Sequence, residues 1–293
     1  MLGLKEPLQL KTVKRIPFYD SVLFCFDKIP NYSDYVLRSV DYASTLGFSG
    51  VPIFTNLSPE ICLLTRRSGV PEIDYSHLDQ ARTALEQVKK RDLDIGFVLT
   101  GPFTNAYSQT REKFLENLVL NPTYVRRVLD HQTCDLLEIT RLVEDLVDFF
   151  VLMDPMASND IISPTHFYDF CAPQYKTLSS SCSKPVILHS PGKNLNNLPY
   201  IISSGINGIQ PIDEDDLVGM LQKASGQICV IGNISKKVIA KGTEQDIYQE
   251  VGRCLSAART NGNPFILHSD FWIRKDTPIE KVKILMKAIK ENG

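Results

Sequence analysis

The sequence predicts an α/β fold, a (β/α)₈ barrel formed as one domain. Three observations support this prediction. Eight short apolar runs alternate with longer segments of helical periodicity, the length of 293 residues suits a barrel, and no G-x-G-x-x-G motif follows any apolar run. The main alternative, a doubly wound open sheet, usually has fewer strands and a glycine-rich first turn. We therefore expect residues 1–293 to form a single TIM-barrel domain.

Each apolar run is nearly continuous and lacks the strict alternation of a half-exposed strand. Strands that are buried on both faces of a parallel sheet have this pattern. The predicted strands are Ser21–Phe26, Phe48–Phe54, Asp94–Thr100, Asp148–Met153, Pro185–His189, Ile206–Ile212, Gln227–Gly232 and Pro264–Ser269.

Helical segments fill the gaps between these runs, with apolar residues three and four positions apart. The predicted helices are Asn31–Leu46, His77–Lys90, Pro122–Glu144, Pro164–Leu178, Asp213–Lys223, Glu244–Ala258 and Thr277–Ile289. Ser163-Pro164 and Asp276-Thr277-Pro278 predict helix N-caps, with proline early in the first turn. The longest connection, Thr55–Ser76, is long enough to serve as a lid or substrate loop.

Composition and charge exclude several functional classes. A net charge of −2 gives no electrostatic footprint for nucleic acid or for an anionic membrane. No stretch reaches the 18 uncharged apolar residues of a membrane span, and the lysine-containing N-terminus has no continuous apolar core of a signal peptide. The seven cysteines are scattered, without a C-x-x-C pair, which suits a reducing compartment. We expect a cytoplasmic protein.

The carboxyl ends of the predicted strands carry the candidate functional residues, because barrel enzymes place their chemistry there. Two of the five histidines, His189 and His268, end apolar runs, and Asp154 and Asp270 occupy equivalent places. Histidine and aspartate that converge in this way suit a divalent metal or acid–base work. We predict Asp154 and His189 as catalytic residues, and His189, His268 and Asp270 as metal ligands. The predicted substrate contacts at other strand ends are Asn56, Thr100, Asp213 and Asn233. Asp27, which follows the first apolar run, is a further strand-end candidate.

Structural roles are the alternative explanation for these residues, least so for His189. A strand-end histidine is often hydrogen-bonded to a neighbouring loop, and a strand-end aspartate often caps the next helix. Arg66 and Arg67, in the long connection, suit an anionic substrate, but a solvated pair of charges is the simpler explanation.

Six segments resemble one known family. They are Gly101–Ala106 (GPFTNA), Leu152–Leu178, Pro185–Gly192 (PVILHSPG), Val230–Ser235 (VIGNIS), Gly242–Leu255 and Asp276–Ile289. Together they cover about two thirds of the chain, in the order in which they stand in the uroporphyrinogen decarboxylase superfamily. The resemblance implies a (β/α)₈ barrel, in agreement with the strand count.

The superfamily has two main branches. Uroporphyrinogen decarboxylase proper binds the carboxylates of its substrate through an arginine-rich R-Q-A-G-R-Y-type motif. The first 60 residues of this chain contain no counterpart of that motif. The chain is more similar to the other branch, the corrinoid-dependent methyltransferases. These enzymes move a methyl group between a small substrate, a cobalamin protein and a thiol.

The resemblance also implies a metal site, from which this chain departs. Thiol-activating members bind zinc through His-x-Cys after the fifth strand and a cysteine after the eighth. His189 matches the histidine, whereas Pro191 and Phe271 stand near the two cysteine positions. Zinc or another divalent metal would therefore need harder ligands, with His189, His268, Asp154 and Asp270 as the available set. Asp154, Asp169 and His189 also match, loosely, the acid–acid–histidine pattern of some demethylating members.

The leading hypothesis is a methyltransferase that works with a corrinoid on a partner protein. A small methyl donor would bind at the barrel mouth, where His189 polarises its heteroatom and Asp154 acts as acid, base or ligand. One alternative is a decarboxylase of porphyrin biosynthesis, which would need arginines such as Arg66, Arg67 or Arg274 at the mouth. The other is a non-catalytic barrel that has lost the family zinc site.

Overall fold

The computed structural model describes most of the chain. It covers residues 4–9, 16–20, 31–54, 56–58, 61–62, 64–67, 70–73, 75–211, 216–269, 272–273 and 276–293. Between residues 56 and 73 only the backbone is described.

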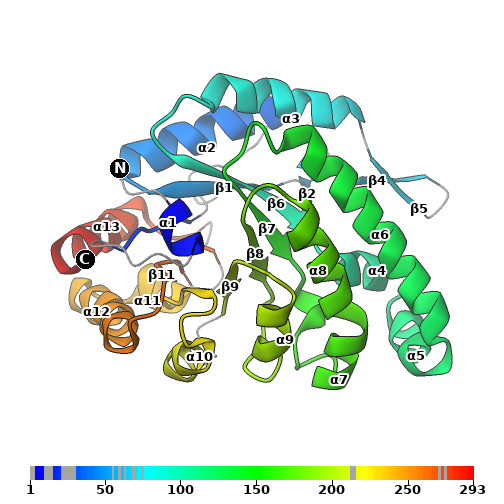
Figure 1. Ribbon diagram of the computed structural model, residues 1–293. Helices are drawn as coiled ribbons and strands as arrows, with labels where there is room; N and C mark the ends of the chain where they lie inside the picture. Colours follow the sequence, from blue (N-terminus) through cyan, green and yellow to red (C-terminus); the bar gives the residue numbers. More distant parts are fainter. Residues whose placement is uncertain are drawn as a thin grey trace.

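A curled parallel sheet forms the centre of the molecule, with helices around it (Figure 1). Its seven strands follow the order β1-β6-β7-β8-β9-β10-β11, and every pair of neighbours is parallel. The strands are β1 (Gly50–Phe54), β6 (Asp94–Thr100), β7 (Phe149–Met153), β8 (Val186–His189), β9 (Gly208–Gln210), β10 (Cys229–Ile231) and β11 (Phe265–Ile266). Each lies within a predicted strand, because each apolar run is buried on both faces.

Two parallel bridges connect the ends of this sheet. Phe18 pairs with Leu267 after β11, and Tyr19 pairs with Gly50 at the start of β1. Residues 18 and 19 therefore lie between the two edge strands, in the place of an eighth strand. The predicted barrel is confirmed. The predicted first strand, Ser21–Phe26, lies outside the described residues, and the observed bridges precede it.

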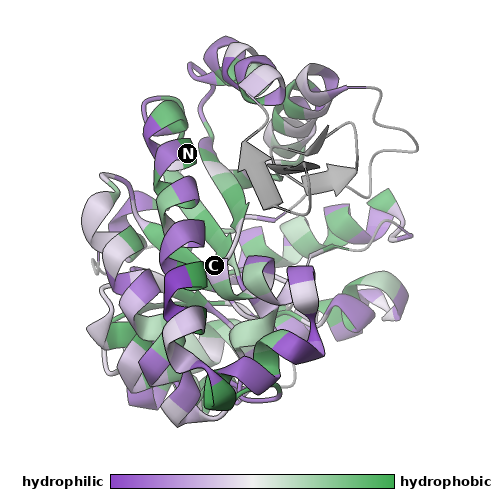
Figure 2. Ribbon diagram, turned by 90° about the vertical axis from the view of Figure 1, so that its right-hand side faces the viewer, coloured by the Kyte–Doolittle hydropathy of each residue, from purple (hydrophilic) through white to green (hydrophobic). Residues whose placement is uncertain are grey.

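Six of the seven predicted helices are found with small shifts of their ends. They are α2 (Tyr32–Leu46), α3 (Tyr75–Val88), α6 (Pro122–Val143), α10 (Leu217–Ala224), α12 (Glu244–Asn261) and α13 (Ile279–Asn292). Figure 2 shows the mixture of hydrophobic and hydrophilic residues on the helices around the hydrophobic strands, as expected of one-sided burial. Among the described residues, no helix is long and apolar enough to span a membrane.

The remaining elements differ from the prediction. Residues 164–181 divide into α7 (Pro164–His166), the π-helix η3 (Phe167–Cys171) and α8 (Ala172–Ser181). Ser163 caps α7 as predicted, but α13 begins after Pro278 without a side-chain cap. The long connection contains two antiparallel hairpins, made of β2 (Asn56–Ser58), β3 (Ile61–Cys62), β4 (Leu64–Arg67) and β5 (Val70–Ile73). Further helices are α1 (Lys5–Leu8), α4 (Pro102–Thr110), α5 (Glu112–Leu120), α9 (Leu198–Ser203) and α11 (Lys236–Lys241).

Helix α1 packs at the amino ends of the strands. The backbone N–H of Leu4 donates to the side chain of Asp94, the first residue of β6. A Cβ atom on Gly208 would lie 3.1 Å from Leu8, so glycine leaves room for that side chain. The amino end of the barrel is therefore packed with apolar side chains, and the polar residues considered below lie at the other end.

Two glycines provide a paired test of this packing. A Cβ on Gly96 would lie 2.3 Å from the buried ring of Phe149, whereas a Cβ on Gly252, inside α12, meets nothing within 4 Å. We expect Gly96→Ala to lower the free energy of unfolding by about 1–3 kcal/mol through overpacking. Gly252→Ala is expected to raise it by about 0.5–1 kcal/mol, because alanine favours the helix. Urea unfolding of both variants checks this, and equal effects would contradict the packing.

Candidate functional site

Seven buried residues gather at the carboxyl ends of the strands, and we call them the mouth cluster: Tyr19, Asp20, His189, Gln210, His268, Ser269 and Trp272. Trp272 is 6% exposed and the other six are fully buried. His189 and Gln210 end β8 and β9, and His268 follows β11. The two histidines that the sequence predicted thus belong to one group.

A directed chain of hydrogen bonds holds His268. The Tyr19 hydroxyl donates to Oε1 of Gln210 at 2.8 Å, so the amide nitrogen of Gln210 faces the imidazole. That nitrogen lies 3.2 Å from Nε2 of His268, whose Nδ1 contacts the carbonyl oxygen of Ser269. Since a carbonyl oxygen only accepts, Nδ1 carries the proton and Nε2 accepts from Gln210. Gln210 Nε2 also lies 2.9 Å from Nδ1, so it is close to both ring nitrogens.

Asp20 fixes the segment that follows His268. Its two carboxylate oxygens accept from the backbone N–H groups of Ser269 and Ile273, each at 3.1 Å. Oδ1 also lies 3.9 Å from Nε2 of His268. Asp20 therefore clamps residues 269 and 273 on either side of Trp272.

Trp272 packs against both histidines. The centre of its indole lies 5.2 Å from that of the His189 ring, at 45°, and 4.8 Å from that of the His268 ring, at 76°. A third ring, Phe54 at the end of β1, packs edge-on at 5.0 Å. Edge-on and tilted pairs of this kind are favourable for aromatic rings. These three contacts fix the orientation of the indole.

Burial keeps both histidine rings neutral. The pKa of His189 falls from 6.5 to about 3, first because burial disfavours the charged ring, then because a protonated His189 would be repelled by His268, once that ring is protonated, and by Lys236. Burial also lowers the pKa of His268, against the opposing effects of Asp20 and the Ser269 carbonyl. At neutral pH each ring therefore carries one N–H donor and one acceptor nitrogen.

This shift predicts a pH dependence of stability. Below pH 6.5 the unfolded chain takes up a proton at His189 that the folded chain resists, so stability is lost as the pH falls toward 3. Between pH 7 and pH 5 we expect His189→Gln to lose about 2 kcal/mol less stability than the original chain. Urea unfolding at the two pH values measures the difference. Identical losses would contradict a buried, neutral His189.

Asp154 lies just after β7, and its side chain caps α4. Its Oδ1 accepts from the backbone N–H and the hydroxyl of Thr104, at 2.7 and 2.6 Å. Its Oδ2 accepts from the Tyr175 hydroxyl at 3.0 Å and from the Phe103 N–H at 3.3 Å. Burial raises the pKa of Asp154 to about 6 despite these four bonds. The contacts favour a structural anchor, and the catalytic role of Asp154 stays a prediction.

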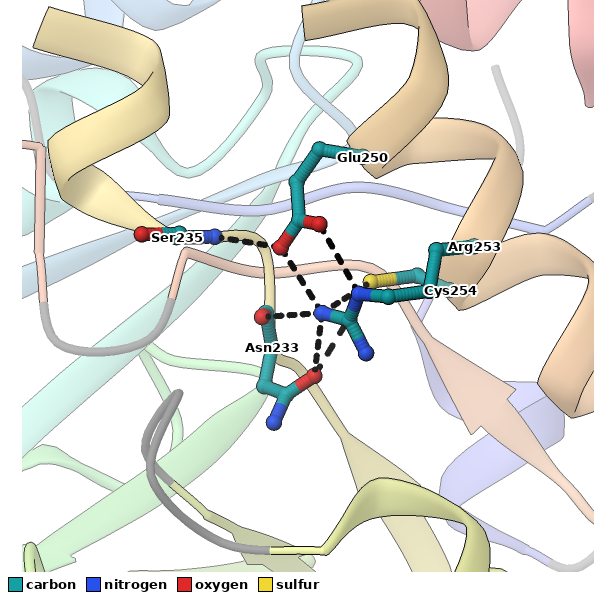
Figure 3. Close-up of polar contacts among 5 residues, drawn as sticks. All are labelled: Asn233, Ser235, Glu250, Arg253 and Cys254. Carbon is teal, nitrogen blue, oxygen red and sulfur yellow. Dashed lines mark hydrogen bonds and ion pairs between the residues drawn. The ribbon is translucent and has the colours of Figure 1, made fainter. Parts of the chain in front are cut away.

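Asn233 takes part in a polar network outside the mouth cluster (Figure 3). Nη2 of Arg253, on α12, donates to the backbone and side-chain oxygens of Asn233, at 2.9 and 3.0 Å. Arg253 is in turn paired with Glu250 at 2.7 Å. Because the guanidinium is a donor, the carboxamide oxygen faces it, and Figure 3 shows the amide nitrogen pointing away.

The structure describes the other predicted residues only in part. Thr100 ends β6, and its carbonyl oxygen accepts from Asn105 at 3.1 Å. Asn56 begins β2, but its side chain is not among those described. Asp213 and Asp270 lie outside the described residues. Their predicted roles therefore stay predictions.

The donor set does not fit the zinc site of the thiol-activating relatives. Ser190 and Pro191 follow His189 where His-x-Cys would require a cysteine, and Phe271 stands near the other cysteine position. The ring nitrogens of His268 face Gln210 and the Ser269 carbonyl. Within the described ranges, no group of three or more His, Cys, Asp or Glu side chains could hold a metal ion.

Several members of the mouth cluster were not predicted from the sequence. Asp20 ends the run PFYD and follows the two bridge residues, Phe18 and Tyr19. The prediction had placed Asp27, after the run Ser21–Phe26, at the end of the first strand. Gln210 ends β9 two residues before the predicted strand end. A polar residue at the end of an apolar run was the available signal for Asp20, whereas Gln210 lies inside the predicted run Ile206–Ile212. Trp272 could not be predicted in this way, because it lies after β11 in a segment where apolar residues have no regular spacing.

Comparison with known proteins places this barrel among its relatives. The sequence model of a family described as uroporphyrinogen decarboxylase matches residues 63–292. A methylated-thiol–coenzyme M methyltransferase of Methanosarcina mazei is 25% identical over 214 residues, which cover 71% of this chain and 57% of that protein. The methylcobamide:CoM methyltransferase MtbA of Methanosarcina acetivorans is 24% identical over 173 residues, 57% of this chain and 51% of that protein. The matches thus span about half the length of these curated relatives.

Solved structures confirm the fold. A methyltransferase from Methanosarcina mazei superposes with a TM-score of 0.81 at 19% identity, covering 99% of both chains. A B12-independent methionine synthase from a Shewanella species superposes with a TM-score of 0.62 at 10% identity, covering 95% of both chains.

Proposed function

Because the chain belongs to the uroporphyrinogen decarboxylase family, we propose that it is a methyltransferase acting between a small methyl donor and a corrinoid on a partner protein. Its curated relatives are methyltransferases, and one of them acts on methylcobamide, a corrinoid. The observation that carries the proposal is the buried, neutral His189, packed on Trp272 at the carboxyl end of the barrel.

His189 would polarise the atom that carries the methyl group. When the methyl group leaves, the electron pair of the broken bond stays on that atom, where negative charge develops. A neutral imidazole can donate its N–H to this charge, and a donor placed in a dry site stabilises it better than water does. The corrinoid, as co-substrate, supplies the nucleophile that takes the methyl group. No metal ion bound by this chain's own side chains takes part in these steps.

The remaining side chains would bind and orient the donor. His268 has both ring nitrogens engaged by its neighbours, so we propose that it positions Trp272 and His189. We propose Asn56, Thr100, Asp213 and Asn233 as substrate contacts, with Arg253 fixing the amide orientation of Asn233. Asp154 would hold α4 against the loops that follow β7 and β8.

The mouth cluster suits a decarboxylase of polycarboxylates less well. Such substrates need cationic partners, usually arginines that bind carboxylate with two hydrogen bonds. The seven residues of the cluster include no arginine or lysine, Lys236 is a single cation near His189, and the one acidic side chain of the cluster is Asp20. A substrate with several carboxylates would meet a negative charge there.

Two assays on the purified protein test the proposal. A panel of methylated thiols, methanol and methylamines is incubated with reduced cobalamin, and methylcobalamin is followed by its absorbance. In parallel, release of carbon dioxide is measured with uroporphyrinogen. We expect methylcobalamin from at least one donor and no carbon dioxide. Carbon dioxide without methyl transfer would favour the decarboxylase, and cobalamin binding without turnover would favour a non-catalytic barrel.

A further inference from the structure

Two buried hydrogen-bond donors of the mouth cluster have no acceptor in the part of the chain that the structure describes. They are the indole Nε1–H of Trp272 and the hydroxyl of Ser269. Both residues are more than nine-tenths buried. An unsatisfied buried donor costs about 1–3 kcal/mol, and native proteins contain few of them. A pair of such donors on one short segment therefore calls for an explanation.

Contacts within the described residues hold the indole of Trp272 and the backbone of Ser269 in place. The Trp272 indole is held between the rings of Phe54, His189 and His268. Ser269 is fixed by its backbone, since its N–H donates to Asp20 and its carbonyl oxygen contacts His268. The nearby Asp20 carboxylate accepts the backbone N–H groups of Ser269 and Ile273.

We propose that Trp272 and Ser269 donate hydrogen bonds to an uncharged oxygen acceptor of the bound small molecule. The inference rests on the proposed methyl-donor site at the barrel mouth, and it specifies the substrate class of that site. Trp272 would be the residue that selects for this acceptor.

The chemistry of the cluster points to an oxygen that carries no charge. An indole N–H only donates, and a thioether sulfur is a weak acceptor, so oxygen is the better partner. An anion would be placed beside Asp20, whose carboxylate lies 3.9 Å from His268. Burying an anion beside a carboxylate costs more than burying a neutral acceptor.

The single tryptophan of the chain provides a direct readout. In a protein labelled with ¹⁵N, one indole N–H signal is expected, and it belongs to Trp272. Three small probes with the same methyl–sulfur skeleton are titrated: dimethyl sulfoxide, dimethyl sulfide and methanesulfonate. We expect dimethyl sulfoxide to shift the signal downfield in a saturable way, with a Kd about fivefold or more below that of dimethyl sulfide. Methanesulfonate is expected to give no saturable shift.

Two hydroxyl variants separate a binding role from a structural one. Ser269→Ala should weaken the binding of dimethyl sulfoxide about fivefold, because one donor is lost. Thr277→Val is the matched control, since the Thr277 hydroxyl is also buried without a described partner but lies outside the mouth cluster. It should leave the Kd unchanged.

An indole signal that no probe moves, or that both sulfur compounds move equally, would overturn the inference. A shift with methanesulfonate alone would also overturn it, as would equal effects of the two variants. These outcomes are independent of methyl transfer. A protein that binds dimethyl sulfoxide through Trp272 but transfers no methyl group would retain the inference and lose the proposed function.

Discussion

His189→Ala is expected to lower the rate of methyl transfer by about 10²-fold or more. Removal of one donor that faces developing charge in a dry site typically costs that much. His189 is fully buried and neutral, and its ring packs on Trp272 beside His268. The measurement is the single-turnover rate of methylcobalamin formation, with circular dichroism to verify the fold of the variant.

Two further variants serve as controls for this result. His189→Gln keeps an N–H donor in a side chain of similar reach, and it should restore part of the lost rate. His131→Ala removes a histidine on α6 whose side chain is 61% exposed, and it should leave the rate unchanged. A His189→Ala protein that folds and retains full activity would contradict the proposed role.

Asp154→Ala is expected to lower the free energy of unfolding by about 3 kcal/mol or more. The carboxylate accepts four hydrogen bonds, and its loss leaves the two N–H groups at the start of α4 without an acceptor. The hydroxyls of Thr104 and Tyr175 lose theirs as well. Each buried donor without a partner costs about 1–3 kcal/mol, although relaxation and water recover part of the sum.

Urea unfolding with a matched control measures this loss. Asp145→Ala removes an aspartate whose side chain is 58% exposed, and it should change the free energy of unfolding by less than about 0.5 kcal/mol. If Asp154→Ala were as mild, Asp154 would not be an anchor. If it instead abolished methyl transfer without loss of stability, the catalytic prediction for Asp154 would be supported.

The fold was predictable from the sequence because the strands of this barrel are nearly continuous apolar runs. That pattern locates each buried strand, and it found the seven strands of the described sheet. The apolar pattern was less informative for the segment that lies between β1 and β11, because that segment is short and contains polar residues. The bridges at Phe18 and Tyr19 fall on a short run, PFYD, next to the longer and more apolar SVLFCF. Length and hydrophobicity favoured the second run, whereas pairing with β1 and β11 involves the first.

The candidate site was predictable only where a polar residue ends an apolar run. His189 and His268 were found in this way, and both belong to the mouth cluster. Gln210 and Asp20 hold their neighbours through hydrogen bonds between segments far apart in the sequence, such as Gln210 with Tyr19. Periodicity carries no information on such pairs. Asp154 illustrates the reverse case, because its position at a strand end suits catalysis and its contacts are those of a helix cap.

The most direct test of the central claim follows a labelled methyl group. A donor that is active in the panel is prepared with a ¹³CD₃ group and mixed with the protein and reduced cobalamin for a single turnover. The methylcobalamin product is then analysed by mass spectrometry. We predict that the intact label reaches cobalamin with the original chain, and that its transfer is about 10²-fold slower with His189→Ala. Label that stays on the donor, while uroporphyrinogen releases carbon dioxide, would contradict a methyltransferase.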